Sequence, residues 1–174
     1  MHLTIFALQM FHWVRVLFLT SLVHVVGGQC PCADASLCQP IQTERRHEKV
    51  AFMVSSANWR SYDYSQLTTI VICTQEIDPQ LLCLAHSQHV RLVWLANYDV
   101  RQLNNVTART EWIQKQIERV ETSYTDGLNL DMEDELADGS EAAQHYTQLV
   151  RELSDAIHIR IPGSMVRCCA LTST

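Results

Sequence analysis

The sequence predicts an α/β fold in which helices cover a parallel sheet. The chain has 174 residues, of which 47% are hydrophobic and 18% are charged, and this composition is typical of one globular domain. Short apolar runs alternate along the chain with longer segments whose apolar residues recur at helical spacing. Because parallel strands need crossover connections, this repeated alternation favours a parallel sheet with covering helices.

Five apolar runs are predicted to be strands, because they are short and rich in β-branched and aliphatic side chains. They cover residues 50–54, 68–73, 90–96, 127–132 and 164–171. The order of strands and helices along the chain indicates the fold class, but it does not show whether the sheet closes on itself.

Three segments between these runs are predicted to be helices. Residues 79–89 begin with Pro79, a residue favoured in the first turn of a helix. Residues 107–124 carry one apolar stripe, formed by Ile113, Ile117, Val120 and Tyr124. The last helix starts at Ser140, whose hydroxyl can cap it, and stops before Pro162. Its buried face is expected to consist of Ala143, Tyr146, Val150, Leu153 and Ile157.

The N-terminus has the layout of a signal peptide. Residues 14–26 read VRVLFLTSLVHVV and are followed by Gly27 and Gly28, small residues suited to a cleavage point. A membrane anchor is the alternative, but a span needs about 20 apolar residues, and Arg15 interrupts a longer one. We therefore expect a signal peptide over residues 1–28, a mature domain over residues 29–174, and no membrane contact after cleavage.

The cysteines agree with export into an oxidising compartment. Cys30, Cys32 and Cys38 are closely spaced after the expected cleavage point and suit a short disulfide-stapled loop. Cys73 and Cys83 fall in a strand-like and a helix-like segment, and both are expected to be buried free thiols. The total of seven cysteines is odd, so at least one has no partner within the chain.

Asn105 opens the triplet Asn-Val-Thr, which is an N-glycosylation sequon. In a protein of the secretory pathway such a triplet marks a surface position. Asn105 is therefore a candidate glycosylation site.

The charge pattern and the histidines argue against nucleic acid and metal. The net charge is −6, and the 13 Lys and Arg residues form no basic stripe, so nucleic acid is not expected as a partner. The eight histidines show no H-E-x-x-H pattern. No cofactor and no metal are expected.

The stretch TDGLNLDMEDE, residues 125–135, alternates aliphatic and polar side chains. In a strand, one face would carry Leu128, Leu130 and Met132, and the other would carry Asn129, Asp131 and Glu133. An open sheet with helices on both faces would bury that polar row at a high cost. A barrel resolves the conflict, because acids at the C-terminal end of a barrel strand face solvent and substrate.

The acids have two other interpretations. Acidic runs are commonly solvated surface, and this is the interpretation for Asp134, Glu135 and Asp138. A calcium loop fails on spacing, because the position that needs glycine holds Asp134 and the twelfth position holds Ser140.

The segment DGLNLDMED resembles the D-G-x-D-x-D-x-E signature on the fourth strand of family 18 glycoside hydrolases, the chitinase-like (β/α)8 barrels. Asp126, Gly127, Asp131 and Glu133 match the signature, and Asn129 replaces its middle aspartate. Three further blocks are similar to the lysosomal chitobiase branch of this family: CPC…LCQPI near the N-terminus, the stretch at residues 59–69, and CLAHS at residues 83–87. The resemblance covers residues 30–166 and implies a TIM-barrel fold.

The resemblance also implies an activity, a compartment and roles for the acids. The expected reaction is hydrolysis of β-1,4-linked N-acetylglucosamine, in the chitobiose core of Asn-linked glycans or in chitin oligosaccharides, in the lysosome. Glu133 would be the general acid, and the negative charge of Asp131 would help it to keep its proton. Asp131 would orient the acetamido group of the substrate, whose oxygen attacks the anomeric carbon. Asn129 would hydrogen-bond Asp131, and Asp126 would hold the start of the strand.

A complete (β/α)8 barrel takes about 250 residues, so this chain is expected to hold the first four to five β/α units. The outermost strands, at residues 50–54 and 164–171, would then be open edges. One interpretation is a truncated form of the hydrolase. A second is a catalytically inactive sugar-binding or interaction module made from a half barrel, and a third is a truncated product that does not fold stably.

Overall fold

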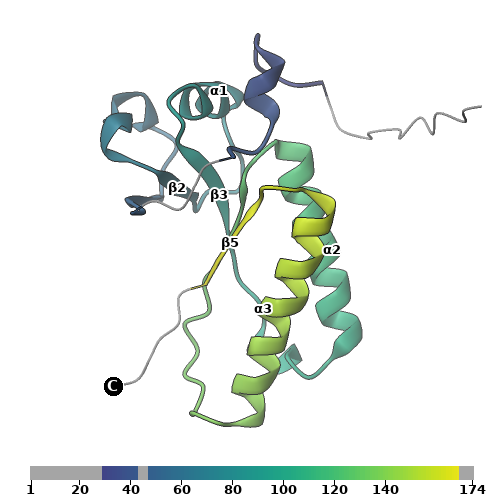
Figure 1. Ribbon diagram of the computed structural model, residues 1–174. Coiled ribbons are helices and arrows are strands. Elements are labelled where there is room, and N and C mark those ends of the chain that lie inside the picture. Colours follow the sequence, from purple (N-terminus) through teal and green to yellow (C-terminus); the bar gives the residue numbers. More distant parts are fainter. Residues whose placement is uncertain (1–28, 43–46, 169–174) are drawn as a thin grey trace, which may run out of the picture.

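The computed structural model describes residues 29–42 and 47–168 (Figure 1). The signal peptide expected over residues 1–28 lies outside the described residues. Five parallel strands form one sheet in the order β1-β2-β3-β4-β5. They are β1 (Val50–Met53), β2 (Thr69–Ile72), β3 (Arg91–Ala96), β4 (Gly127–Leu130) and β5 (Met165–Cys168). The parallel sheet predicted from the sequence is confirmed.

Three α-helices connect the strands, and each predicted helix is present. They are α1 (Pro79–Ser87), α2 (Val106–Ser123) and α3 (Glu141–Arg160). A polar side chain caps each start: the carboxylate of Asp78 for α1, the amide oxygen of Asn105 for α2 and the hydroxyl of Ser140 for α3. None of the helices in the described part of the chain is both long and apolar enough to span a membrane.

The helices pack on one face of the sheet, which we call the helix face. Its side chains include Ile70, Leu92, Trp94, Leu128 and Leu130, and all of them lie in the main hydrophobic core with the apolar residues of the helices. Figure 1 shows α2 and α3 side by side. The aliphatic side chains of residues 128–132 therefore point into this core, and the polar side chains between them point to the opposite face.

The opposite face, which we call the inner face, carries a second set of side chains in register. One row across the sheet contains Phe52, Val71, Val93, Gly127 and Met165. The next row contains Leu95, Asn129 and Arg167 on three adjacent strands. Val71 and Val93 are fully buried but lie outside the main core, and Phe52 on the edge strand is 50% exposed.

Several elements are shorter than predicted. Strand β4 ends at Leu130 rather than at residue 132. The N–H of Asp131 still donates to the carbonyl oxygen of Ala96 at 2.9 Å, but β3 itself ends at Ala96, and the following residues lose their ladder partner. Helix α1 ends at Ser87, because His89 has a left-handed backbone with φ of 56°. The described part of the fifth strand is Met165–Cys168.

One disulfide joins the N-terminal segment to α1, and a second closes a loop within that segment. Cys30 is bonded to Cys38 and Cys32 to Cys83, and in Figure 1 this segment lies against α1. The expectation that Cys83 is a free thiol is therefore wrong. The spacing of cysteines along a chain does not reveal which pairs meet when a helix packs against a distant loop. Cys73 is free, as expected, and is half-buried.

Candidate active site

Strand β4 places the residues of the signature motif. Leu128 and Leu130 are fully buried in the main core and Met132 is nearly so, which assigns the aliphatic half of the motif to the helix face. Asn129, in register with Leu95 and Arg167, lies on the inner face. The strand thus separates the two kinds of side chain as the sequence predicts.

Gly127 is needed because β5 comes very close to the start of β4. Its φ of +145° lies outside the range of ordinary L residues, and a Cβ at this position would overlap the backbone of Met165. The N–H of Met165 donates to the carbonyl oxygen of Asp126 at 2.6 Å. The glycine of the motif therefore fixes how β4 and β5 pair.

Asp131 and Glu133 follow β4 at the C-terminal edge of the sheet. Asp131 is half-buried and Glu133 is exposed, so neither carboxyl group is buried beneath a helix. Within the described residues, neither side chain makes a hydrogen bond or an ion pair with another group. Both acids are free to meet a ligand from solvent.

The thiol of Cys73, which follows β2, is affected by the charge of Asp131. The Cys73 N–H donates to the carbonyl oxygen of Met53 at 3.0 Å, which extends the ladder between β1 and β2 by one residue. Burial raises the pKa of the Cys73 thiol, and the negative charge of Asp131 raises this pKa further. The charge of Asp131 therefore acts on Cys73 at the C-terminal edge, a relation that sequence patterns alone do not reveal.

Asn129 does not make the hydrogen bond that was expected. Asn129 is 1% exposed, and its Nδ2 has no hydrogen-bond partner in the described part of the chain. Residues two apart on one strand face are separated by about 7 Å, so the amide does not reach the carboxylate of Asp131.

Asp126 lies at the other end of β4, among groups that fasten the strand. Its Oδ1 accepts from the N–H of Ile41 at 2.7 Å. Its Oδ2 accepts from the N–H of Leu92 at 2.7 Å and shares a hydrogen bond of 2.9 Å with Nε2 of His86. His86 also donates through Nδ1 to the carbonyl oxygen of Leu37 at 2.7 Å. Asp126 thus joins the N-terminal segment, α1 and β3 at the start of β4.

Tryptophan rings can stack on sugars, but the tryptophans Trp59 and Trp94 belong to the core. Trp59 and Trp94 are nearly fully buried, with the guanidinium groups of Arg60 and Arg119 stacked on their rings. Trp112 makes an edge-to-face contact with Tyr98. These rings stabilise the fold rather than offering a flat surface to a sugar.

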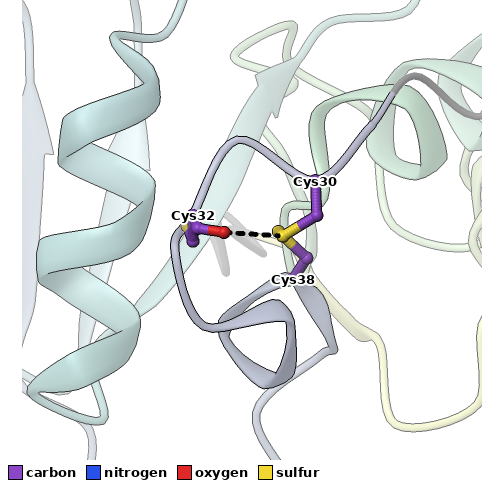
Figure 2. A group of neighbouring side chains, drawn as sticks. All are labelled: Cys30, Cys32 and Cys38. Atoms are coloured by element: carbon purple, nitrogen blue, oxygen red, sulfur yellow. Dashed lines mark hydrogen bonds between the residues drawn. A yellow bond between two sulfur atoms is a disulfide. The ribbon is translucent and has the colours of Figure 1, made fainter.

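The sulfur atoms of Cys30, Cys32 and Cys38 lie within 4.8 Å of one another (Figure 2). All three belong to disulfides, so they offer no thiolate to a metal. The Cys30 sulfur is 3.8 Å from the carbonyl oxygen of Cys32, but a disulfide sulfur has no hydrogen to donate. The cluster is a structural staple.

Asn105, the candidate glycosylation site, also caps helix α2. It is exposed, and its amide oxygen accepts from the N–H of Ala108 at 3.1 Å as the cap of α2. Its Nδ2 donates to Oε1 of Gln102 at 3.1 Å. A glycan on Nδ2 would leave the capping oxygen available.

The chain is similar in sequence to several di-N-acetylchitobiases. No protein-family model matches the chain. A probable di-N-acetylchitobiase of Dictyostelium discoideum is 42% identical over 127 residues, which are 73% of this chain and 33% of that protein. Di-N-acetylchitobiase of Mus musculus is 35% identical over 151 residues, 87% of this chain and 41% of that protein. Di-N-acetylchitobiase of Bos taurus is 38% identical over 137 residues, 79% of this chain and 78% of that sequence.

The chain belongs to the di-N-acetylchitobiase family. This membership confirms the chitinase-like family 18 relationship predicted from the signature motif, and it places the chain in a family of chitobiose and chitin glycoside hydrolases. The chain spans between 33% and 41% of the length of the Dictyostelium and mouse relatives that it matches.

Solved structures agree on the fold. A chitinase from Bacteroides thetaiotaomicron superimposes with a TM-score of 0.56 at 17% identity, over 70% of this chain and 45% of that one. The chitinase domain of the spore coat protein CotE from Clostridium difficile gives 0.54 at 14% identity, over 72% of this chain and 42% of that one. Together with the parallel sheet, these matches confirm the α/β fold class, a part of a (β/α)8 barrel.

Proposed function

We propose that the chain is part of a glycoside hydrolase that cleaves β-1,4-linked N-acetylglucosamine by substrate-assisted acid catalysis. The observation that carries this proposal is the division of β4, in which Leu128 and Leu130 enter the core while Asp131 and Glu133 remain accessible at its C-terminal edge. In barrels of this kind, that edge is where catalytic groups are found.

Glu133 is proposed as the general acid that protonates the leaving glycosidic oxygen. It is exposed and makes no contact with another charged group in the described residues, so the oxygen of a bound sugar can approach it.

Asp131 is proposed to orient the acetamido group of the sugar, whose carbonyl oxygen attacks the anomeric carbon. Hydrolysis then needs no second protein carboxylate as a nucleophile, but it does need a 2-acetamido sugar. The expected substrates are therefore the chitobiose core of Asn-linked glycans and chitin oligosaccharides.

Asp126 and Asn129 are proposed to support this site from below. The hydrogen bonds of Asp126 hold the start of β4 against β3 and α1, which fixes the strand that bears the acids. Asn129 lies on the inner face of β4, two residues before Asp131.

The proposal extends to the rest of the chain. Residues 1–28 would be a signal peptide, residues 29–174 part of the catalytic domain, and Asn105 a glycosylation site on its surface. The two disulfides among the described residues fit an oxidising compartment. We place the protein in the secretory pathway, with the lysosome as its destination.

A turnover assay tests the proposed function. A fluorogenic N,N′-diacetylchitobioside would be incubated with wild type, Glu133→Gln and Glu135→Gln. The proposal expects release by wild type, loss of release in Glu133→Gln, and wild-type release in Glu135→Gln, an exposed acid nearby. Equal release by wild type and Glu133→Gln would contradict it.

The sugar-binding module remains a second candidate, favoured by the open edge strand β1 and the half-exposed Phe52 on the inner face. It predicts that wild type binds diacetylchitobiose in calorimetry without any release. That result would replace hydrolysis by binding as the function.

A further inference from the structure

We propose that Asn129 and Arg167 form a binding site for a carboxylate on the inner face, such as the carboxylate of a sugar acid. The inference concerns binding and does not depend on hydrolysis. It rests on two buried hydrogen-bond donors on adjacent strands that have no acceptor among the residues that the structure describes.

The two residues lie next to each other. Asn129 of β4 is paired in register with Arg167 of β5, and side chains in register on parallel strands leave the same face about 4.8 Å apart. The row beneath them contains Gly127 and Met165, and Leu95 lies on the other side of Asn129. The floor and one wall of the site offer no side-chain acceptor.

Both residues bury a nitrogen without a partner. Nδ2 of Asn129 and Nη1 of Arg167 are inaccessible to solvent and make no hydrogen bond to any residue within 29–42 and 47–168. A buried donor without an acceptor destabilises a fold, and such groups are rare in native proteins. Two such donors on adjacent strands indicate a binding site for a ligand that supplies the acceptor.

The charge of Arg167 selects the class of ligand. Within the described residues no ion pair joins this guanidinium to a carboxylate. A neutral acceptor such as an amide would satisfy the hydrogen bonds but leave the charge unbalanced. A carboxylate provides two oxygens for two donors and balances the charge, and arginine binds such planar groups in a forked geometry.

The residue at position 129 decides whether Arg167 has a partner inside the chain. An aspartate here would place a carboxylate beside the guanidinium and occupy the site. Asparagine has the same shape but supplies a donor in place of an oxygen. Asn129→Asp therefore closes the site with almost no change in volume.

The test measures binding directly by calorimetry on the full chain. Sodium glucuronate, glucose and sodium acetate are titrated at matched ionic strength. We expect glucuronate to bind at least about ten-fold more tightly than glucose. Binding of acetate as tight as that of glucuronate would also support the site and would show that a free carboxylate suffices.

Variants locate the site. Arg167→Gln and Asn129→Asp should each weaken glucuronate binding by about ten-fold or more, and Arg101→Gln, an exposed arginine paired with Asp99, should not. Should Arg167→Gln fail to fold, the isosteric Asn129→Asp carries the test. Equal binding of glucuronate and glucose, absence of glucuronate binding, or unchanged binding in both variants would overturn the proposal. None of these results depends on turnover of a chitobioside.

Discussion

Nε2 of His86 lies 2.9 Å from Oδ2 of Asp126, and both side chains are shielded from solvent. The other ring nitrogen of His86 faces the carbonyl oxygen of Leu37. This buried pair ties α1 and the N-terminal segment to the strand bearing the candidate catalytic acids.

Replacing Asp126 by asparagine should destabilise the fold strongly. The change removes a buried carboxylate oxygen from its partners and presents an NH2 group to backbone donors. We expect the free energy of unfolding to fall by about 3–5 kcal/mol, measured by urea denaturation. Asp138→Asn, at an exposed position, should change it by less than about 0.5 kcal/mol. Similar values for the two variants would contradict the role given to Asp126.

The two disulfides should differ in their effect on stability. The Cys32–Cys83 bond closes a separation of 51 residues and the Cys30–Cys38 bond one of 8. Loop-closure entropy then gives about 4 kcal/mol for the first and about 2.5 kcal/mol for the second. Removing each pair by double serine substitution and measuring unfolding tests this order. A larger loss on removing Cys30 and Cys38 would contradict it.

Gly127→Ala should cost far more than Gly139→Ala. A methyl group at 127 overlaps the backbone of Met165, whereas at 139 it meets no atom within 4 Å. Both glycines have positive φ, so Gly139→Ala reports the backbone strain alone, about 1 kcal/mol. We expect a loss above about 3 kcal/mol for Gly127→Ala in thermal unfolding. Equal losses would show that β5 does not approach β4 as described.

The ion pair between α2 and α3 should make stability depend on pH. A hydrogen bond from Arg109 holds the pKa of Glu152 below its usual value of 4.5, so the folded state favours the ionised form. This contribution is complete above the unfolded pKa and is lost as the pH falls through the lower folded pKa. Wild type should exceed Glu152→Gln in stability at pH 7, and the difference should shrink below about pH 4. A difference that is independent of pH would contradict the pairing.

Much of the fold follows from sequence patterns because they reflect local geometry. The alternation of aliphatic and polar residues at 128–131 correctly separates the helix face from the inner face, since strand parity leaves no other choice. The caps at Asn105 and Ser140 mark where α2 and α3 begin. Strand ends were less predictable, because β4 stops where its neighbour β3 runs out of residues.

Long-range contacts could not be predicted from the pattern. Nothing in the spacing of cysteines indicates that Cys32 meets Cys83, and nothing near His86 points to Asp126, which lies 40 residues further along the chain. The adjacency of Asn129 and Arg167 depends on the register of two strands joined by a whole helix. Such relations appear only when the chain is folded.

The placement of Asp131 beside Cys73 is the relation on which the proposed site depends most. Cys73 follows β2 and Asp131 follows β4, and the alternation of side chains along each strand puts both residues on the inner side of the sheet. The negative charge of Asp131 raises the pKa of the Cys73 thiol, and removing that charge should lower this pKa. More thiolate would then be present at a fixed pH.

The most direct test is the rate at which iodoacetamide alkylates Cys73 at pH 8 in wild type and in Asp131→Asn, followed by peptide mass spectrometry. Cys168, a free and exposed cysteine on β5, serves as the internal control in the same samples. We expect faster alkylation of Cys73 in Asp131→Asn with the rate at Cys168 unchanged. An unchanged or slower rate at Cys73, in a variant that unfolds like wild type, would contradict the placement of Asp131 and with it the proposed active site.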